Sequence, residues 1–449
     1  MTTTLSDIAN VIHHGGKDTV TGSCHELKLP QGCILIDCGL FQGQDLSFGG
    51  RTASLDIEFP VDHVQALALT HAHIDHIGRL PWLLAAGFKG SIYCTEATAE
   101  LVPLMLEDGL KLQLGLNYQQ RQQILNIIRK QLKPCDYGQW VNLPHLADVR
   151  FQPAGHILGS AYVEFKLPSE EIIVFSGDLG PSNTPLLPDP QPPERADYLF
   201  IESTYGDKQH EDIATRSTRL NNIIDHALTD GGVILIPAFS VGRTQELLFD
   251  IEQLINQREL ASSLPIILDS PLANKVTKTY RRFKTLWGQE AKQRLESQRH
   301  PLAFDQCITV ENHKEHMALV NRLASTDEPA IVVAASGMCE GGRIVNYLKA
   351  LLPDERNDVL FAGYQAQGTL GAAIQAGRST VEIDSQQIEV NAQIHTISGY
   401  SAHADKNDLL RFVTGIPTPP KAVHLIHGEE RAKRELGKEL ENTGIKVVY

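Results

Sequence analysis

The sequence lacks several features that define particular classes of protein. Its seven cysteines are scattered over 449 residues without a Cys-x-x-Cys pair, and their odd number argues against a disulfide framework. No apolar stretch reaches the roughly 18 residues that a membrane-spanning helix needs. The first residues have neither the basic start nor the apolar core of a secretory signal. These absences predict a cytoplasmic protein with reduced thiols and no membrane partner.

Positive charge is also scarce. The chain carries 40 Lys and Arg against 54 Asp and Glu, which gives a formal net charge of −14. Proteins that bind nucleic acids usually present a basic face, so this balance counts against such a substrate. It does not exclude one, because a local cationic cleft or a bound metal can attract an anion to an acidic protein.

The apolar runs predict an α/β protein whose pattern changes along the chain. The first ~205 residues alternate short strands with loops and contain a long helical region between Leu101 and Leu132. From about residue 208 to 390, continuous apolar runs alternate with helices, as in a parallel sheet that is covered on both faces. The last ~60 residues return to short strands and end with a charged helix from Glu429 to Glu441.

A dense group of metal-ligand side chains follows the apolar strand at residues 64–69. His71, His73, Asp75 and His76 fall within six residues. On a turn, the first two can face one side and the last two another, as two neighbouring metal ions would require. Imidazole and carboxylate ligands suit zinc, and the absence of a nearby Cys cluster argues against a closed structural site.

Further candidate ligands recur after other predicted strands. These are His156, Asp178 and His427. Three imidazoles (His71, His73, His156) would hold one Zn²⁺, while Asp75, His76 and His427 would hold a second. Asp178 is then the natural bridging carboxylate. A hydroxide shared by both metals would be ionised near neutral pH and serve as the nucleophile.

The order of these motifs resembles that of the metallo-β-lactamase superfamily. Three further segments resemble the acidic motif, the histidine motif and the last motif of its β-CASP branch: Phe200–Gly206, Gly399–Asp405 and Ile426–Glu429. The resemblance covers nearly the whole chain. Length and motif order are most similar to compact prokaryotic relatives of the endonuclease subunit of the eukaryotic pre-mRNA cleavage and polyadenylation factor.

This resemblance implies a four-layered αββα metallo-β-lactamase domain that is interrupted by an inserted α/β β-CASP domain. The expected ranges are 1–207 for the first part, 208–390 for the inserted domain and 391–449 for the returning part. The resemblance also implies that the catalytic site lies in the cleft between the two domains.

Glu202 and His403 need a separate role, because seven ligands already complete two zinc shells. A carboxylate that is hydrogen-bonded to an imidazole favours the imidazolium, so His403 could protonate a departing alkoxide. The alternative is a buried Glu–His pair that only holds the core together.

Two loops in the middle region could bind phosphate. Each joins an apolar strand to a helix, where exposed backbone N–H groups attract anions and an Arg adds a bidentate contact. The candidate residues are Ser240, Arg243, Ser336, Gly337 and Arg343. Plain turn chemistry is the alternative for both loops.

The resemblance implies a zinc-dependent ribonuclease that cleaves single-stranded RNA as an endonuclease, a 5′→3′ exonuclease or both. One alternative is a DNA-directed nuclease of the same fold, but that branch usually has Val where this chain has His427. A small-molecule metallohydrolase is another, although it would need neither the inserted domain nor the Glu202/His403 pair. A scaffold subunit with a decayed site ranks last, since every expected ligand is present. The sequence leaves the oligomeric state open, with a homodimer as one option.

Overall fold

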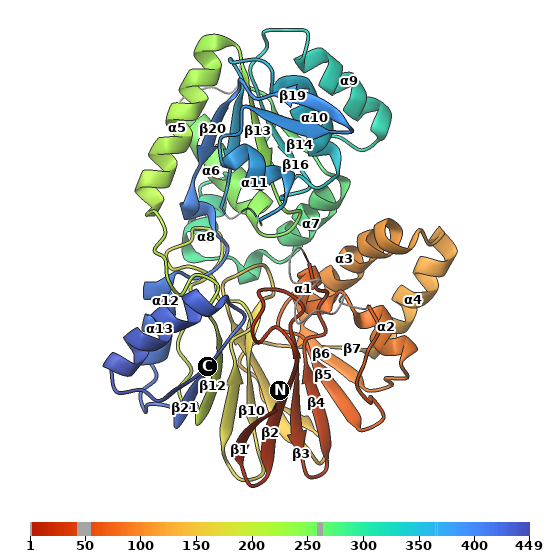
Figure 1. The fold of residues 1–449 in the computed structure, drawn as a ribbon, viewed down its shortest axis with the longest axis vertical. Coiled ribbons are helices and arrows are strands. Elements are labelled where there is room, and N and C mark those ends of the chain that lie inside the picture. Colours follow the sequence, from red (N-terminus) through yellow and green to blue (C-terminus); the bar gives the residue numbers. More distant parts are fainter. Residues whose placement is uncertain (1, 43–54, 258–263, 364, 366) are drawn as a thin grey trace. The chain divides into compact units, whose positions relative to one another are not determined.

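The chain folds into two compact units. The computed structural model describes residues 2–42, 55–257, 264–363, 365 and 367–449. The first unit comprises Met1–Ser182, Pro188–Gln209 and Ala402–Tyr449, and the second comprises Asn183–Leu187 and His210–Ser401. The C-terminal segment thus belongs to the same unit as the N-terminal half (Figure 1). The domain ranges expected from the sequence stay predictions.

The first unit contains two seven-stranded sheets. In spatial order, the first sheet consists of β1 (Thr2–Ser6), β2 (Ala9–Gly15), β3 (Cys24–Leu29), β4 (Gly32–Ile36), β5 (Val64–Ala68), β6 (Ser91–Thr95) and β7 (Leu132–Cys135). The second consists of β22 (Val447–Val448), β21 (Ala422–Ile426), β12 (Tyr198–Glu202), β11 (Ile172–Phe175), β10 (Ala161–Lys166), β9 (Ala147–Pro153) and β8 (Val141–Leu143). The returning strand β21 pairs in parallel with β12, which places Ile426 beside Glu202.

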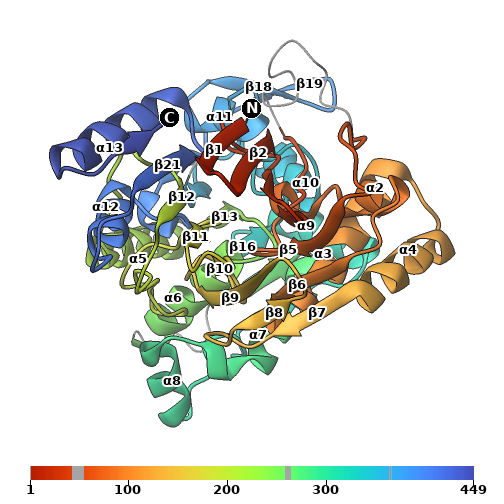
Figure 2. The ribbon, with the colours of Figure 1, turned by 90° about the horizontal axis from the view of Figure 1, so that it is seen from below.

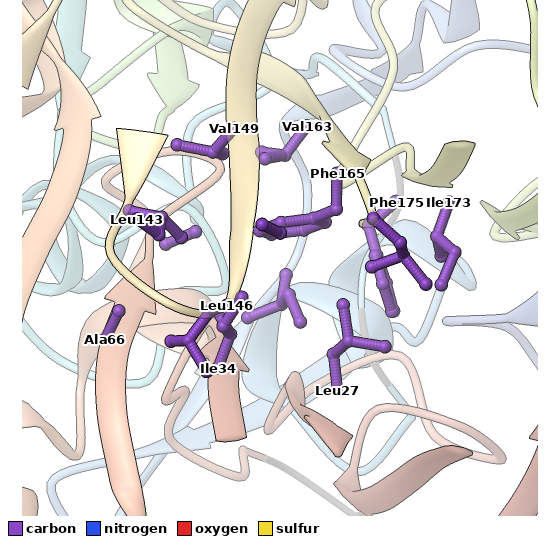
Figure 3. Packing of buried hydrophobic residues seen from close by; sticks show 14 of the residues in the cluster. Leu27, Ile34, Ala66, Leu143, Leu146, Val149, Val163, Phe165, Ile173 and Phe175 are labelled. Carbon is purple, nitrogen blue, oxygen red and sulfur yellow. The ribbon is translucent and has the colours of Figure 1, made fainter. Parts of the chain in front are cut away.

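The two sheets pack face to face through alternating apolar side chains. Leu27 and Ile34 of the first sheet and Phe165 and Phe175 of the second belong to one buried cluster (Figure 3). Burying a side chain of this size stabilises the fold by roughly 1.5–3 kcal/mol. This shared core holds the strand ends, and the loops that follow them, in fixed positions.

Helices cover the outer faces of both sheets (Figure 2). On the first sheet these are α1 (Ile74–Ile77), α2 (Leu80–Ala85), α3 (Glu96–Leu114) and α4 (Tyr118–Gln131), and on the second α12 (Lys406–Thr414) and α13 (Glu430–Asn442). Phe412 of α12 and Leu436 of α13 lie in a second buried cluster with Leu199 of β12 and Leu425 of β21. The expected αββα arrangement is therefore confirmed.

The long helical region expected between Leu101 and Leu132 is two helices. Gly115 ends α3 in the left-handed conformation, at φ 58°, which glycine adopts without steric cost. Asn117 then begins α4 with a capping box that Gln120 completes. The apolar periodicity runs through both helices and therefore conceals the break.

The second unit is built on a six-stranded parallel sheet. Its order is β15 (Cys307–Thr309), β14 (Ile266–Asp269), β16 (Ala330–Ala334), β13 (Val233–Pro237), β17 (Asp358–Phe361) and β20 (Gln393–Thr396), and β18 (Thr380–Ile383) and β19 (Gln386–Glu389) form a separate hairpin. The helices are α5 (Ile213–Asp230), α6 (Arg243–Gln257), α7 (Pro271–Arg282), α8 (Gln289–Glu296), α9 (His313–Leu323), α10 (Arg343–Leu351) and α11 (Leu370–Gln375). Among the described residues, every helix of the chain is too short or too polar to cross a membrane.

Candidate metal centre

The candidate ligands of the first unit all follow strand ends. The segment after β5 carries His71 and His73 and runs into α1, which contains Asp75 and His76. His156 lies between β9 and β10, Asp178 follows β11, and His427 follows β21. The shared core of the two sheets thus brings together residues that are up to 356 positions apart in the sequence.

Three histidines and Asp178 form the first metal-binding group. The ligand atoms of His71, His73, His156 and Asp178 lie within 4.8 Å of one another. Nδ1 of His73 is 3.0 Å from Nε2 of His71 and 2.9 Å from Nε2 of His156. Oδ2 of Asp178 is 3.6 Å from Nε2 of both His71 and His156. Three imidazole nitrogens and one carboxylate oxygen therefore converge on one point, as a metal ion requires.

The other oxygen of Asp178 faces a second group. Asp75, His76, Asp178 and His427 also have ligand atoms within 4.8 Å of one another. Oδ1 of Asp178 is 3.3 Å from Nε2 of His76 and 3.4 Å from Nε2 of His427. The two oxygens of Asp178 therefore face two different sets of potential ligand atoms.

Hydrogen bonds from behind orient the ligand side chains. Nδ1 of His76 lies 2.7 Å from Oδ2 of Asp37, and Nδ1 of His156 lies 2.8 Å from the carbonyl oxygen of Ala402. The Asp37 carboxylate also accepts hydrogen bonds from the backbone and hydroxyl of Thr70, both at 2.8 Å. A partner on Nδ1 leaves Nε2 as the ligand atom and fixes the ring plane. The sequence motifs did not reveal this role of Asp37.

Two glycines let the loops reach these positions. Gly177 has a φ of 52°, and a Cβ there would lie 2.6 Å from the Thr70 side chain. A Cβ on Gly180 would lie 2.1 Å from the carbonyl oxygen of Gly155. Gly177 thus lets the Asp178 loop pack against the loop of His71, and Gly180 lets it pack against the loop of His156.

Burial and neighbouring carboxylates shift the pKa values of the ligands in different directions. Burial lowers the pKa of His71 and His156 well below the usual value and that of His427 to about 4, whereas at His76 the carboxylates outweigh burial and raise the pKa well above its usual value. Burial alone would raise the pKa of the Asp178 carboxyl, but the surrounding histidines outweigh this effect and hold the pKa well below its usual range. Neutral imidazoles and an ionised carboxylate are the states that bind metal ions.

The donor set fits zinc. Nε2 of His76 and Oδ1 of Asp178 are buried, and neither forms a hydrogen bond with any residue that the structure describes. Leaving such atoms unsatisfied costs roughly 1–3 kcal/mol each. A divalent cation shared by their lone pairs removes this cost. Imidazole and carboxylate ligands without sulfur are typical of catalytic zinc.

Glu202 and His403 lie beside the Asp178 carboxylate. Nδ1 of His403 is 3.1 Å from Oε2 of Glu202 and 3.9 Å from Oδ2 of Asp178. Glu202 is fully buried, and its Oε1 accepts a hydrogen bond from the backbone of Leu179 at 2.6 Å. Burial lowers the pKa of His403, but the carboxylates of Glu202 and Asp178 outweigh it and raise this pKa to about 9. These two carboxylates therefore favour the imidazolium form of His403 at the edge of this ligand group.

The predicted phosphate-binding residues lie in the second unit, and their polar groups contact the unit itself. Arg343 begins α10 and donates to Oδ1 of Asp269 at 2.6 Å and to the carbonyl of Val310 at 2.9 Å. Arg243 is buried and donates to the carbonyl of Ala362.

The remaining three candidates of these loops are similarly placed. The hydroxyl of Ser336 donates to the Gly341 carbonyl at 3.1 Å, and the hydroxyl of Ser240 is 3.3 Å from that of Ser270. A Cβ on Gly337 would lie 2.9 Å from the Phe239 ring. The role of all five residues in phosphate binding stays a prediction.

Comparisons with known proteins assign the chain to a family. Residues 19–207 match the model of the metallo-beta-lactamase superfamily, 244–374 that of the Beta-Casp domain, and 387–449 that of the Zn-dependent metallo-hydrolase RNA specificity domain.

Several curated relatives match over most of this chain. A protein named Ribonuclease TTHA0252, from Thermus thermophilus, is 36% identical over 97% of each chain. An RNase J-like protein from Methanocaldococcus jannaschii is 32% identical over 93% of this chain and 91% of its own. The transcription termination factor FttA from the same organism is 31% identical over 93% of this chain, which spans 66% of that relative.

A solved structure shares the fold. The crystal structure of a protein of unknown function from Enterococcus faecalis V583 matches 98% of each chain with a TM-score of 0.56 at 13% identity. Together with the family models and the relatives, it confirms the expected α/β fold class. The chain belongs to the β-CASP branch of the metallo-β-lactamase superfamily, a family of metal-dependent hydrolases.

Proposed function

We propose that this protein is a ribonuclease with two zinc ions, which hydrolyses phosphodiester bonds of single-stranded RNA. The observation that carries the proposal is the Asp178 carboxylate, whose two oxygens face two separate groups of ligand atoms. When bound at such a centre, zinc supplies hydroxide near neutral pH and polarises phosphoryl oxygens.

The side chains around the centre have distinct roles in this proposal. His71, His73 and His156 hold one metal ion, Asp75, His76 and His427 hold the other, and Asp178 contributes to both. His403 donates a proton to the departing 3′ oxygen, because its Nδ1 bonds to Glu202 and the raised pKa keeps the ring protonated. Glu202 orients the ring and favours its charged form.

RNA is favoured over other substrates by the relatives. Two of those described above are named as ribonucleases or as RNase-like, and the C-terminal segment matches an RNA specificity domain. His427 is in the second group of ligands, at the position where the DNA-acting branch is expected to have Val. A homodimeric assembly is a further part of this proposal. Phosphate binding by the five loop residues would compete with their internal contacts, and the salt dependence of RNA binding tests it.

The decisive assay uses metal-replete protein with end-labelled single-stranded RNA and DNA of matching sequence. We expect cleavage of RNA that leaves a 5′-phosphate and a 3′-hydroxyl, with little cleavage of DNA. Equal turnover of both polymers would favour the DNA-directed alternative. Hydrolysis of a thioester or lactone without cleavage of either polymer would favour a small-molecule hydrolase.

A further inference from the structure

A second group of metal-ligand side chains lies in the first sheet, and it shares no residue with the centre around Asp178. It consists of His14, Glu26, Cys33 and His63. Glu26 lies on β3 and Cys33 lies on the neighbouring strand β4. The two are diagonal neighbours across these strands, because Glu26 pairs with Leu35, which is two residues beyond Cys33. Leu27 and Ile34, which follow them, point into the core between the sheets. Glu26 and Cys33 therefore lie on the opposite face of this sheet.

Two irregularities of the sheet lie beside the two histidines of this group. The register of β2 and β3 shifts between His13 and Gly15, so His14 is the extra residue of a bulge. The register of β4 and β5 shifts beside Cys33, whose backbone N–H bonds to the carbonyl of His63 at 3.1 Å. Bulges often redirect a side chain toward a functional site.

The four side chains converge on the Glu26 carboxylate. Oε2 of Glu26 is 2.8 Å from Nε2 of His14, and Oε1 is 3.0 Å from Nε2 of His63. The ligand atoms of Glu26, Cys33 and His63 all lie within 4.8 Å of one another. Zinc bonds of about 2.0–2.3 Å place the ligand atoms of a tetrahedron roughly 3.3–3.8 Å apart. His14 contacts this group through Glu26 alone, so its ring would have to rotate toward Cys33 and His63 to complete the shell.

The surroundings suit a cation that arrives from solvent. The Glu26 side chain is only 3% exposed, and zinc would replace its bonds to the two imidazoles as the positive partner that a buried carboxylate needs. The His63 side chain is 37% exposed, which leaves a path to this group. Burial and the neighbouring carboxylate raise the pKa of the Cys33 thiol to about 12. Zinc binding would displace this proton, as it does from other coordinating thiols.

We propose that His14, Glu26, Cys33 and His63 form an additional zinc site with a structural role. Two imidazoles, one thiolate and one carboxylate provide four ligands of the types that zinc binds, and the sulfur selects against magnesium and calcium. Bound zinc ties β2, β3 and β4 to the segment that enters β5 and stabilises this sheet.

Cobalt substitution separates this site from the centre around Asp178, because only this site contains a cysteine. Protein reconstituted with Co²⁺ should show thiolate-to-cobalt charge-transfer absorption in the near ultraviolet. Cys33→Ser should abolish this band and keep RNA cleavage. Cys94→Ser is the matched control, since Cys94 is also buried in this sheet but belongs to no ligand group among the described residues. Absence of the band from the wild type, or its persistence in Cys33→Ser, would overturn the proposal.

A second variant tests the proposal even if Cys33→Ser does not fold. His63→Ala changes a half-exposed side chain and should lower the zinc content by about one equivalent per chain without loss of cleavage. Unchanged zinc content in this variant would also refute the additional site. If the band is present but the protein cleaves no RNA, the proposed function fails and this site stands.

Discussion

The two units use the same sequence pattern, a buried strand followed by polar residues, for different purposes. In the first unit, the side chains after β5, β11 and β21 direct potential metal-ligand atoms toward one another. Two of these ligand atoms are buried and form no hydrogen bond with any described residue. In the second unit, Arg343 at the start of a comparable helix donates hydrogen bonds to the Asp269 carboxylate and to backbone carbonyls. Unsatisfied ligand atoms therefore distinguish the centre around Asp178 from these internally bonded loops of the second unit.

The largest effect should follow from loss of Asp178 in the first unit. Asp178→Ala removes a ligand from both metal groups, so cleavage of RNA should be abolished and the bound metal strongly reduced. Elemental analysis and the cleavage assay measure both properties. The cobalt–thiolate band should persist in this variant. Retention of full metal content would contradict the connecting role of Asp178.

The next largest effect concerns His403. His403→Ala should keep the metal content and lower turnover roughly 10²–10⁴-fold, the usual contribution of a general acid. Glu202→Gln should produce a milder form of the same defect, because Gln orients the ring without stabilising its charge.

A nitrophenyl phosphodiester provides the control for this role, since its leaving group needs no proton. The His403→Ala variant should cleave it almost as fast as the wild type does. An equal loss of rate on RNA and on this ester would mean that His403 is structural or a metal ligand.

A smaller effect should come from Asp37, which orients His76 from behind. Asp37→Asn keeps the size of the side chain but removes its charge, so the affinity for metal should fall about 10–100-fold. Competition with a metal chelator measures this affinity. Asp136→Asn is the control, because Asp136 is exposed. Equal affinities of the two variants would show that Asp37 has no influence on the metal centre.

The smallest effect is expected in the second unit, where the contacts of Arg343 should contribute to stability. Arg343→Ala should lower the free energy of unfolding by about 1–3 kcal/mol, because it removes the hydrogen bond to buried Asp269 and those to two backbone carbonyls. Arg322→Ala, at an exposed ion pair, should change it by less than about 1 kcal/mol. Urea denaturation measures both.

The salt dependence of RNA binding distinguishes the two roles of Arg343. A phosphate contact would reduce the slope of affinity against salt by roughly one unit when the residue is removed. If Arg343→Ala reduces this slope without lowering stability, the second unit binds phosphate at this loop and the contrast between the units is wrong.

The metal ligands could be predicted from the sequence, because they lie close together in the chain or belong to recognisable motifs. Four of them lie within six residues, and His156, Asp178 and His427 each follow a recognisable strand. The role of Asp37 could not be predicted, because it depends on a contact with His76, 39 residues away. The Glu26 group could not be predicted either, because it depends on pairing between strands that no periodicity shows. The contacts of Arg343 depend on Asp269, 74 residues away, so sequence reasoning could not separate a phosphate contact from an internal ion pair.

Stepwise zinc reconstitution tests the central claim most directly. The Cys33→Ser variant is the suitable background, because it removes the additional site and leaves the centre around Asp178. Metal-free protein is titrated with zinc while RNA cleavage and bound metal are measured together. The proposed centre predicts that cleavage reaches its maximum at about two bound zinc ions per chain. Full activity with one bound ion, or with none, would contradict it.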